Sequence, residues 1–165
     1  MSRVLAIVLS LLLIAGCATG RPEPVRNQEA PYGKKIKDWQ ERIRREGWTE
    51  AGVRGLLADC RNMVRYQLEL KDHWSTPREF IADGFEGDCE DIATFLMGTL
   101  KRLGYRHSVR ILVVRGLFNY HALLKVELPE GRWAVFETMP GGRLEVAPSL
   151  LQPIVEFDES HIAYF

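Results

Sequence analysis

Apolar residues in the first half of the chain recur at helical spacing, with polar residues between them. Ile36, Trp39 and Ile43 lie on one face of a predicted helix, which we expect to end at Gly47. Thr49 can cap a second, longer helix directly after it. The apolar stripe of this second helix reads Val53, Leu57, Cys60, Val64 and Leu68.

Two further helices are predicted from their start signals. Thr76-Pro77-Arg78-Glu79 combines a capping threonine, a proline at the first helical position and a glutamate three residues after the cap. We expect this short helix to end at Gly84. The next helix has one continuous apolar face made of Cys89, Ile92, Ala93, Leu96, Leu100 and Leu103. Because Cys89 lies on this face, it should point inward. Asp88 can cap the helix, and Asp91 can bond back to the cap.

The second half of the chain has the pattern of β-strands. Runs rich in aliphatic, β-branched and aromatic residues cover 108–115, 120–128 and 132–138. A three-residue turn with proline and glycine separates the last two runs, so we expect a hairpin in which Leu128 pairs with Arg132. In that register His121 and Glu137 share one face of the hairpin, whereas a slip of one residue would separate them.

The two faces of this hairpin differ in character. One face reads His121, Leu123, Lys125, Glu127, Trp133, Val135, Glu137 and Met139. The opposite face is apolar and reads Ala122, Leu124, Val126, Ala134 and Phe136. We expect the helix of Cys89 to cover part of the first face, near its histidine end, and other elements to bury the second face.

Cys89, His121 and Glu137 form a candidate set for nucleophilic acyl transfer. In this chemistry a thiolate attacks, an imidazole carries its proton and a carboxylate orients the imidazole. Free amides at a helix start lower the pKa of a thiol, but the carboxylates of Asp88 and Glu90 oppose that effect. The imidazole must therefore do much of the activation. A histidine on such a strand is more often a plain core residue, and here the glutamate on the same face favours the functional role.

The N-terminus has the pattern of a secretory signal. Arg3 precedes a short apolar run followed by small residues, so we expect a signal peptide at 1–16. The run is too short to span a bilayer. Ile14-Ala15-Gly16-Cys17 resembles the bacterial lipobox, which implies lipidation of Cys17 and a lipid anchor in the cell envelope. By the same resemblance Ala18 favours the outer membrane, facing the periplasm; an ordinary signal peptide with an incidental Cys17 is the alternative.

Length and charge leave room for one domain and give no electrostatic case for nucleic-acid binding. Of the 165 residues, 22 are basic and 22 are acidic, so the chain carries no excess of positive charge. The proline-rich segment 17–34 is predicted to be a flexible tether, and 35–165 to be one folded domain. After Cys17 the chain has only Cys60, expected in the core, and Cys89. A disulfide between these two would remove the nucleophile, and no disulfide framework is implied.

Four short segments, spread over roughly residues 70–140, carry a family resemblance. They read Trp74-Ser75-Thr76-Pro77, Gly87-Asp88-Cys89-Glu90-Asp91-Ile92-Ala93, Tyr120-His121-Ala122 and Trp133-Ala134-Val135-Phe136-Glu137. Together they resemble the bacterial transglutaminase-like cysteine peptidases of the papain-like superfamily. The resemblance implies an α+β fold in which the nucleophile helix packs on an antiparallel β-sheet and is preceded by helices. It also implies that Cys89 is the nucleophile, His121 the base and Glu137 the orienting acid, a position where the family more often has aspartate.

By this resemblance the chain is expected to be a periplasmic, membrane-anchored cysteine peptidase or amidase. It would cleave a peptide or protein substrate through a thioester on Cys89. Trp74 and Asp88 are expected at the substrate cleft. The structural alternative for Trp74 is a plain core residue, and for Asp88 it is the cap of the helix that begins at Cys89. The chemistry needs no metal or other cofactor. Some relatives depend on calcium, and Asp88 and Glu90 match their flanking acids, so calcium binding stays open although a full set of oxygen ligands is not visible.

Three other functions fit parts of the pattern. The first is a non-catalytic binding or assembly lipoprotein of the same fold, against which the complete set of three residues argues. The second is a transglutaminase-type acyltransferase, which shares the first half-reaction with a peptidase. The third is a cell-wall hydrolase of another papain-like family, in which small residues typically follow the cysteine, unlike Glu90-Asp91-Ile92. The domain is also small for its class, which leaves room for an accessory protein that completes the cleft.

Overall fold

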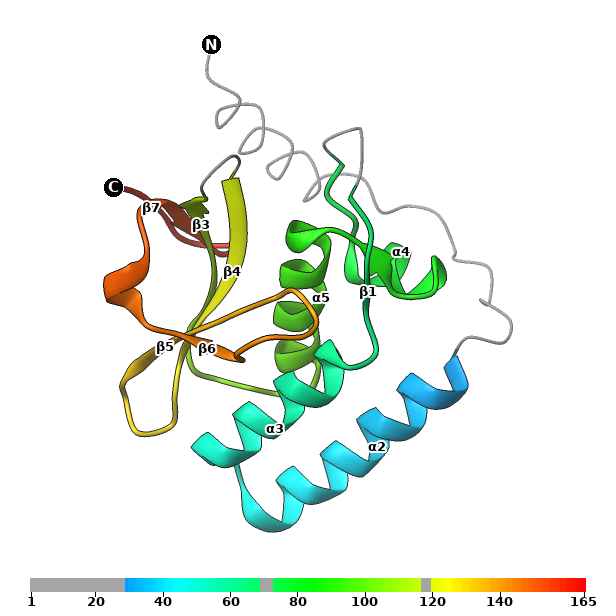
Figure 1. The fold of residues 1–165 in the computed structure, drawn as a ribbon. Helices are drawn as coiled ribbons and strands as arrows, with labels where there is room; N and C mark the ends of the chain where they lie inside the picture. Colours follow the sequence, from blue (N-terminus) through cyan, green and yellow to red (C-terminus); the bar gives the residue numbers. More distant parts are fainter. Residues whose placement is uncertain (1–28, 69–72, 117–119) are drawn as a thin grey trace.

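Helices occupy the N-terminal half of the described chain and a β-sheet the C-terminal half (Figure 1). The computed structural model describes residues 29–68, 73–116 and 120–165. The α-helices in these ranges are α2 (Glu29–Glu46), α3 (Glu50–Arg61), α4 (Pro77–Ala82) and α5 (Cys89–Arg102). None of the described helices is both long and apolar enough to cross a bilayer. The predicted signal peptide 1–16 and the lipidation site Cys17 lie outside the described residues.

The main sheet of the described chain has six strands, each antiparallel to its neighbours, in the order β6-β5-β4-β3-β7-β8. The strands are β3 (Val109–Arg115), β4 (Tyr120–Glu127), β5 (Trp133–Phe136), β6 (Glu145–Val146), β7 (Pro153–Phe157) and β8 (Ile162–Tyr164). A short 3-10 helix, Pro148–Leu150, lies between β6 and β7 along the chain. Two shorter strands, β1 (Arg65–Tyr66) and β2 (Glu86–Gly87), pair in parallel.

Local sequence signals placed the starts of α3, α4 and α5 correctly. The Thr49 hydroxyl caps α3 by accepting a hydrogen bond from the Gly52 N–H at 3.0 Å. At the start of α4, Thr76 and Glu79 form the predicted capping box, in which each side chain accepts a hydrogen bond from the backbone N–H of the other. The α+β architecture, with the Cys89 helix packed on an antiparallel sheet and preceded by helices, is confirmed.

Helix α5 lies beside the sheet (Figure 1) and buries its apolar face there. The sheet residues in these two core clusters are Val109, Ile111, Val113, Ala122, Leu124, Val126, Ala134, Phe136, Val155 and Phe157. On β4 and β5 they alternate with His121 and Glu137, so the expectation that α5 covers the His121 face is wrong. The physical reason is burial: an apolar helix face is stabilised most against an apolar strand face, and the His121 face carries Lys125 and Glu127.

Helix α2 starts earlier than the sequence predicted. Its first residue is Glu29, inside the 17–34 range predicted as a tether. Tyr32 is buried, and its ring centroid lies 5.6 Å from that of Phe95 on α5. The Tyr32 hydroxyl also lies within hydrogen-bond distance, 3.0 Å, of the Thr99 hydroxyl. One buried aromatic residue therefore holds the first turns of α2 against α5, in a segment whose composition is otherwise polar.

Helix α3 ends earlier than its apolar stripe indicated. It stops at Arg61, and Leu68, predicted on the stripe, is exposed. The chain continues instead into β1, after which the Gln67 N–H donates a hydrogen bond to the Gly87 carbonyl at 2.8 Å. Backbone pairing with a segment distant in sequence thus replaces the helical bonds that the local pattern favoured.

The C-terminal residues 140–165, for which the sequence predicted no arrangement, complete the sheet. Strand β7 pairs with β3 and adds Val155 and Phe157 to the core under α5. Leu151, just before β7, packs on the opposite face of the sheet. There it contacts a small buried cluster of Leu112, Val114, Leu123 and Val135.

Candidate active site

A tight turn places Cys89 at the first residue of α5. Gly87 precedes it, and a Cβ atom at this position would lie 2.5 Å from the Asp91 carboxylate and 2.9 Å from the Phe80 ring. Only glycine fits that space. Asp88 is the N-cap of α5, and its N–H donates to the Asp91 carboxylate at 3.3 Å. The predicted capping box is confirmed, and it explains why glycine and two aspartates surround the cysteine.

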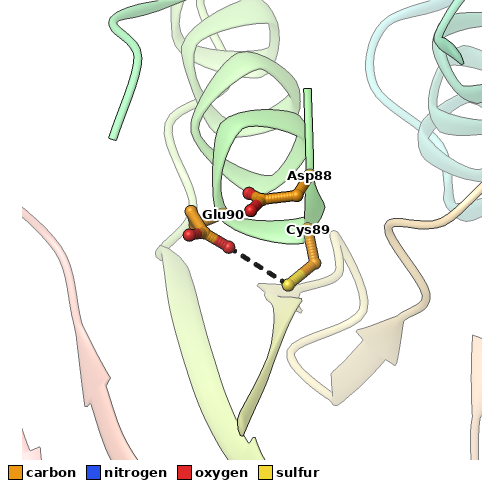
Figure 2. Close-up of side chains that lie close together, drawn as sticks. All are labelled: Asp88, Cys89 and Glu90. Atoms are coloured by element: carbon orange, nitrogen blue, oxygen red, sulfur yellow. Dashed lines mark hydrogen bonds between the residues drawn. The ribbon is translucent and has the colours of Figure 1, made fainter. Parts of the chain in front are cut away.

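The Cys89 thiol is buried, protonated and in contact with a carboxylate. Its S–H donates to Glu90 Oε2 at 3.2 Å, and Figure 2 shows the two groups pointing toward each other. The Ala122 N–H donates to the sulfur at 3.4 Å. Burial raises the pKa of the thiol to about 12, and the Glu90 and Asp88 carboxylates add to the rise while the Ala122 N–H opposes it. In this arrangement the thiol carries its proton at neutral pH.

His121 and Glu137 are already paired. His121 Nε2 lies 2.8 Å from Glu137 Oε1, and each side chain is 23% exposed. The pairing of Lys125 with Val135 matches the register predicted from the turn, which is therefore confirmed. Burial alone would raise the pKa of Glu137, but hydrogen bonds from His121 and from the Met139 N–H lower it below its ordinary value. The pair is thus stabilised with the carboxylate ionised.

The backbone of the His121 strand contacts the thiol one residue after the histidine. Ala122, whose N–H contacts the sulfur, directly follows His121 on β4. Within the described residues, the hydrogen bonds of the thiol go to Glu90 and Ala122, and none joins it to His121. Because Nε2 of His121 is bonded to Glu137, Nδ1 is the ring nitrogen that stays available to another partner.

Trp74 and Ser75 form a short segment, here called the strap, that lies beside Cys89. Trp74 packs against the core cluster that contains Cys89, and its ring centroid lies 5.7 Å from that of Phe157. The Ser75 N–H donates to the Asp91 carboxylate at 2.7 Å, which ties the strap to the first turn of α5. The Trp74 indole N–H is buried and has no hydrogen-bond partner among the described residues. Sequence reasoning placed Trp74 near the cleft but missed the role of Asp91 as its anchor.

Tyr66 is a further neighbour of the thiol that sequence reasoning missed. The parallel pairing of β1 with β2 sets Tyr66 opposite Gly87, and the side chain is 39% exposed. Burial, followed by the nearby groups of Cys89, Asp88 and Glu90, raises the pKa of the Tyr66 phenol. No local signal could have found this residue, because a two-residue parallel ladder leaves no periodicity in the sequence.

Asp88, Cys89 and Glu90 also offer potential metal ligands. One ligand atom of each residue lies within 4.8 Å of the others, on the first turn of α5 (Figure 2). The two carboxylates are donors of the type that calcium takes, whereas a thiol is not. Calcium binds six to eight oxygens, so the carboxylates fit as part of such a shell, with the remaining oxygens coming from water, backbone carbonyls or substrate.

Comparison with known proteins places the fold. No protein-family model and no curated protein sequence matches this chain. Among solved structures, calcium-bound LapG of Legionella pneumophila is 22% identical over 95% of this chain and 87% of its own, with a TM-score of 0.65. The EGTA-treated form of the same protein, also 22% identical over 95% of this chain and 84% of its own, gives a TM-score of 0.63. A presumed cysteine protease from Cytophaga hutchinsonii, 16% identical, covers all of this chain and 54% of its own, with a TM-score of 0.58. At these identities the similarity shows that the chain shares the α+β fold of these proteins.

Proposed function

We propose that this chain is a cysteine peptidase or amidase with Cys89 as nucleophile, His121 as base and Glu137 as orienting acid. The observation that carries the proposal is the His121–Glu137 pair at 2.8 Å on the strand whose next amide touches the Cys89 sulfur. Acyl transfer by a thiol uses three groups that occur in this site. They are a thiol at a helix start, an imidazole paired with a carboxylate, and a contact between the thiol and the strand that carries the histidine. The shared fold with LapG supports it.

The proposed reaction begins when Cys89 gives its proton to Nδ1 of His121. The thiolate attacks the carbonyl carbon of an amide, forming a C–S bond, and backbone amides at the start of α5 stabilise the oxyanion. His121 then protonates the departing nitrogen, the C–N bond breaks and a thioester remains. Water attacks the thioester, gives a proton to His121 and releases the acid with the Cys89 thiolate as leaving group. An amine in place of water would give acyl transfer.

The cleft in this proposal is built from the strap and the first turn of α5. Trp74 lines it, and its buried indole N–H is a donor available to a substrate carbonyl. Asp88, the helix cap, is buried beside the nucleophile. Before the reaction can start, Glu90 must release the thiol, because the hydrogen bond between them stabilises the protonated form.

Calcium is proposed as an effector of this site. Asp88 and Glu90 would hold it, and its charge would neutralise the two carboxylates that now oppose formation of the Cys89 thiolate. The calcium-bound state of the similar LapG structure supports this proposal. The steps of the reaction itself use the side chains of the protein alone.

For the N-terminus, which lies outside the described residues, we propose a signal peptide at 1–16, lipidation of Cys17 and a place in the outer membrane, facing the periplasm. The lipobox-like Ile14-Ala15-Gly16-Cys17 supports this. Labelling cells with a tritiated fatty acid tests it: the chain should take up label, and Cys17→Ala should not. Substrate and any accessory protein would then meet the enzyme in the cell envelope.

A non-catalytic binding lipoprotein is the second candidate. It is favoured by the protonated thiol, whose pKa is about 12, and by the absence of a hydrogen bond between Cys89 and His121 in the described residues. In that case the site would keep its shape and have no reactive thiol.

Alkylation by iodoacetamide separates the two candidates. The full-length chain in detergent is labelled across a pH series, and mass spectrometry quantifies the adduct at Cys89. Cys60 is an internal control, because burial raises the pKa of its thiol to about 12 as well, and it lies in the core cluster that does not contain Cys89. An enzyme requires Cys89 to react well below the free-thiol pKa of about 8.5 and to lose that reactivity in His121→Ala. A Cys89 that is as inert as Cys60 both with and without added calcium, or that is indifferent to His121, would overturn the enzyme proposal.

A further inference from the structure

Arg61, at the end of α3, is a buried cation far in sequence from the candidate triad. The residue is 5% exposed. A guanidinium taken out of water is costly unless its donors are paired. Arg61 meets this requirement with backbone oxygens: Nε donates to the Met139 carbonyl at 3.0 Å, and Nη2 donates to the same carbonyl and to the Gly141 carbonyl, the latter at 2.5 Å.

These carbonyls belong to the turn that follows β5 and Glu137. The turn reads Met139-Pro140-Gly141-Gly142, and Gly141 and Gly142 have φ values of 76° and 62°. Two successive left-handed residues make a sharp turn that side chains with a Cβ atom rarely adopt. The two glycines have no side chains that could hold the turn. The hydrogen bonds from the Arg61 guanidinium to the Met139 and Gly141 carbonyls, here called the Arg61 fork, hold it instead.

The same turn contacts the catalytic carboxylate. The Met139 N–H donates to Glu137 Oε1 at 3.0 Å, and this oxygen is the one that lies 2.8 Å from His121 Nε2. Met139 is therefore held at its carbonyl by Arg61 while its amide binds Glu137. The charge of Arg61 also reaches this carboxylate: burial lowers the pKa of the guanidinium, and attraction to Glu137 opposes the fall.

We propose that Arg61 is a positioning residue for the Glu137–His121 pair and acts through the backbone of Met139. Its fork fixes the turn, the fixed turn aims the Met139 N–H at Glu137 Oε1, and the carboxylate is thereby held in the orientation that binds His121. The use of this pair in catalysis rests on the proposed function. The positioning itself is a property of the fold and can be tested without any substrate.

Arg54 provides a matched control. It lies on the same helix, α3, and its side chain is 30% exposed, so it is less buried than Arg61. Its guanidinium pairs with Glu50 at 2.7 Å and with Glu145, and both are side-chain carboxylates. Removing Arg54 therefore removes a comparable set of hydrogen bonds from α3 and leaves the contacts to the 139–141 turn in place.

The test is NMR of the His121 Nε2 proton in the full-length chain in detergent, assigned by its loss in His121→Ala. A proton held by a carboxylate is shifted downfield and exchanges slowly with water. In Arg61→Met we expect it to exchange about tenfold faster or to vanish, whereas in Arg54→Met it should persist. Arg61→Lys keeps the charge and one donor, and it should restore part of the protection.

Each outcome decides a point. An unchanged proton signal in folded Arg61→Met, judged by circular dichroism, overturns the positioning role. If Arg61→Met does not fold, Arg61→Lys decides, because unchanged protection there shows that the two-carbonyl fork is dispensable. Equal loss in Arg54→Met would reduce Arg61 to a general stabilising residue and also overturn the proposal. Loss specific to Arg61 beside an inert Cys89 would leave the positioning intact and refute only the enzyme proposal.

Discussion

The two halves of the candidate site, the His121–Glu137 pair and the Cys89 thiol, differ in how far each is prepared for catalysis. His121 on β4 and Glu137, directly after β5, are joined at 2.8 Å, with the carboxylate ionised and bound by the Met139 N–H. At the start of α5, the Cys89 thiol donates to Glu90 and has a pKa of about 12. The proposed base is thus already paired with its carboxylate, and the proposed nucleophile is held in its protonated form. The contrast indicates that the carboxylates around the thiol, Asp88 and Glu90, control the reactivity of Cys89.

The difference has a physical cause in what surrounds each half. Hydrogen bonds from His121 and from the Met139 N–H to the ionised Glu137 carboxylate outweigh the effect of its burial. The thiol is buried beside two carboxylates, Asp88 and Glu90, and a thiolate there would be a third negative charge. Activation consequently requires a positive charge near the carboxylates or the departure of Glu90 from the sulfur.

The largest effect is expected from a variant that disrupts the His121–Glu137 pair. In Glu137→Gln the amide binds His121 as a neutral group, so we expect hydrolysis of p-nitrophenyl acetate to fall by about 10²–10⁴-fold. Glu127→Gln is the control, because Glu127 lies on the same hairpin face and its carboxylate accepts from the Ser108 N–H at 3.2 Å. Equal losses in both variants would show that the hairpin, and not the pair, was damaged.

Calcium should reduce the difference between the two halves. Added to EGTA-treated protein, it should neutralise Asp88 and Glu90 and speed alkylation of Cys89 by about tenfold, since a lower thiol pKa gives more thiolate. The melting temperature should rise with calcium as well, which is a readout independent of reactivity. Asp88→Asn should weaken both effects. A melting temperature and alkylation rate that ignore calcium would contradict the effector role.

A smaller change of the same sign is expected when Glu90 alone loses its charge. Glu90→Gln removes one carboxylate from the sulfur, so the pKa of Cys89 should fall. Each unit of that fall raises the alkylation rate at neutral pH by about threefold, because the gain in thiolate is partly offset by lower nucleophilicity. Glu86→Gln is the control, since Glu86 pairs with Arg65 on the neighbouring strands. A slower Cys89 in Glu90→Gln would mean that Glu90 assists the thiol.

The smallest expected effect is on stability in acid. The folded state holds the pKa of Glu137 below its ordinary value of 4.5. The ionised carboxylate therefore stabilises the fold above that pH, and this contribution is lost as the pH falls through the folded pKa. Urea unfolding of Glu137→Gln should show a weaker loss of stability between neutral and acidic pH than the wild type. Parallel curves for the two proteins would contradict the pair as a source of acid sensitivity.

Much of the site was predictable because its parts are local or set by one short turn. The capping box of Asp88 and Asp91 needs only the first turn of one helix, and the register that pairs His121 with Glu137 follows from the length of the β4–β5 turn. Such features depend on residues close in sequence, where spacing alone limits the geometry. The catalytic roles of Cys89, His121 and Glu137 stay predictions that the chemistry of the protein must test.

Contacts between distant segments were not predictable in this way. Four features of the structure join residues far apart in the chain. They are the apolar sheet face that α5 covers, the pairing of β7 with β3, the parallel ladder that brings Tyr66 beside Gly87, and the hydrogen bonds from Arg61 to Met139. Each depends on how whole elements pack, and a pattern of apolar positions shows only that a face is buried, not against what.

The sequence by itself determined the four described helices, the strands β3, β4 and β5, the place of the thiol at a helix start and the face shared by the histidine and the glutamate. Only the tertiary structure decided the state of those groups. The protonation of Cys89 depends on its burial and on the direction of the Glu90 side chain, and the ionisation of Glu137 depends on donors from His121 and Met139. Reactivity is set by the electrostatic surroundings of an atom, and those surroundings exist only once distant segments have packed together.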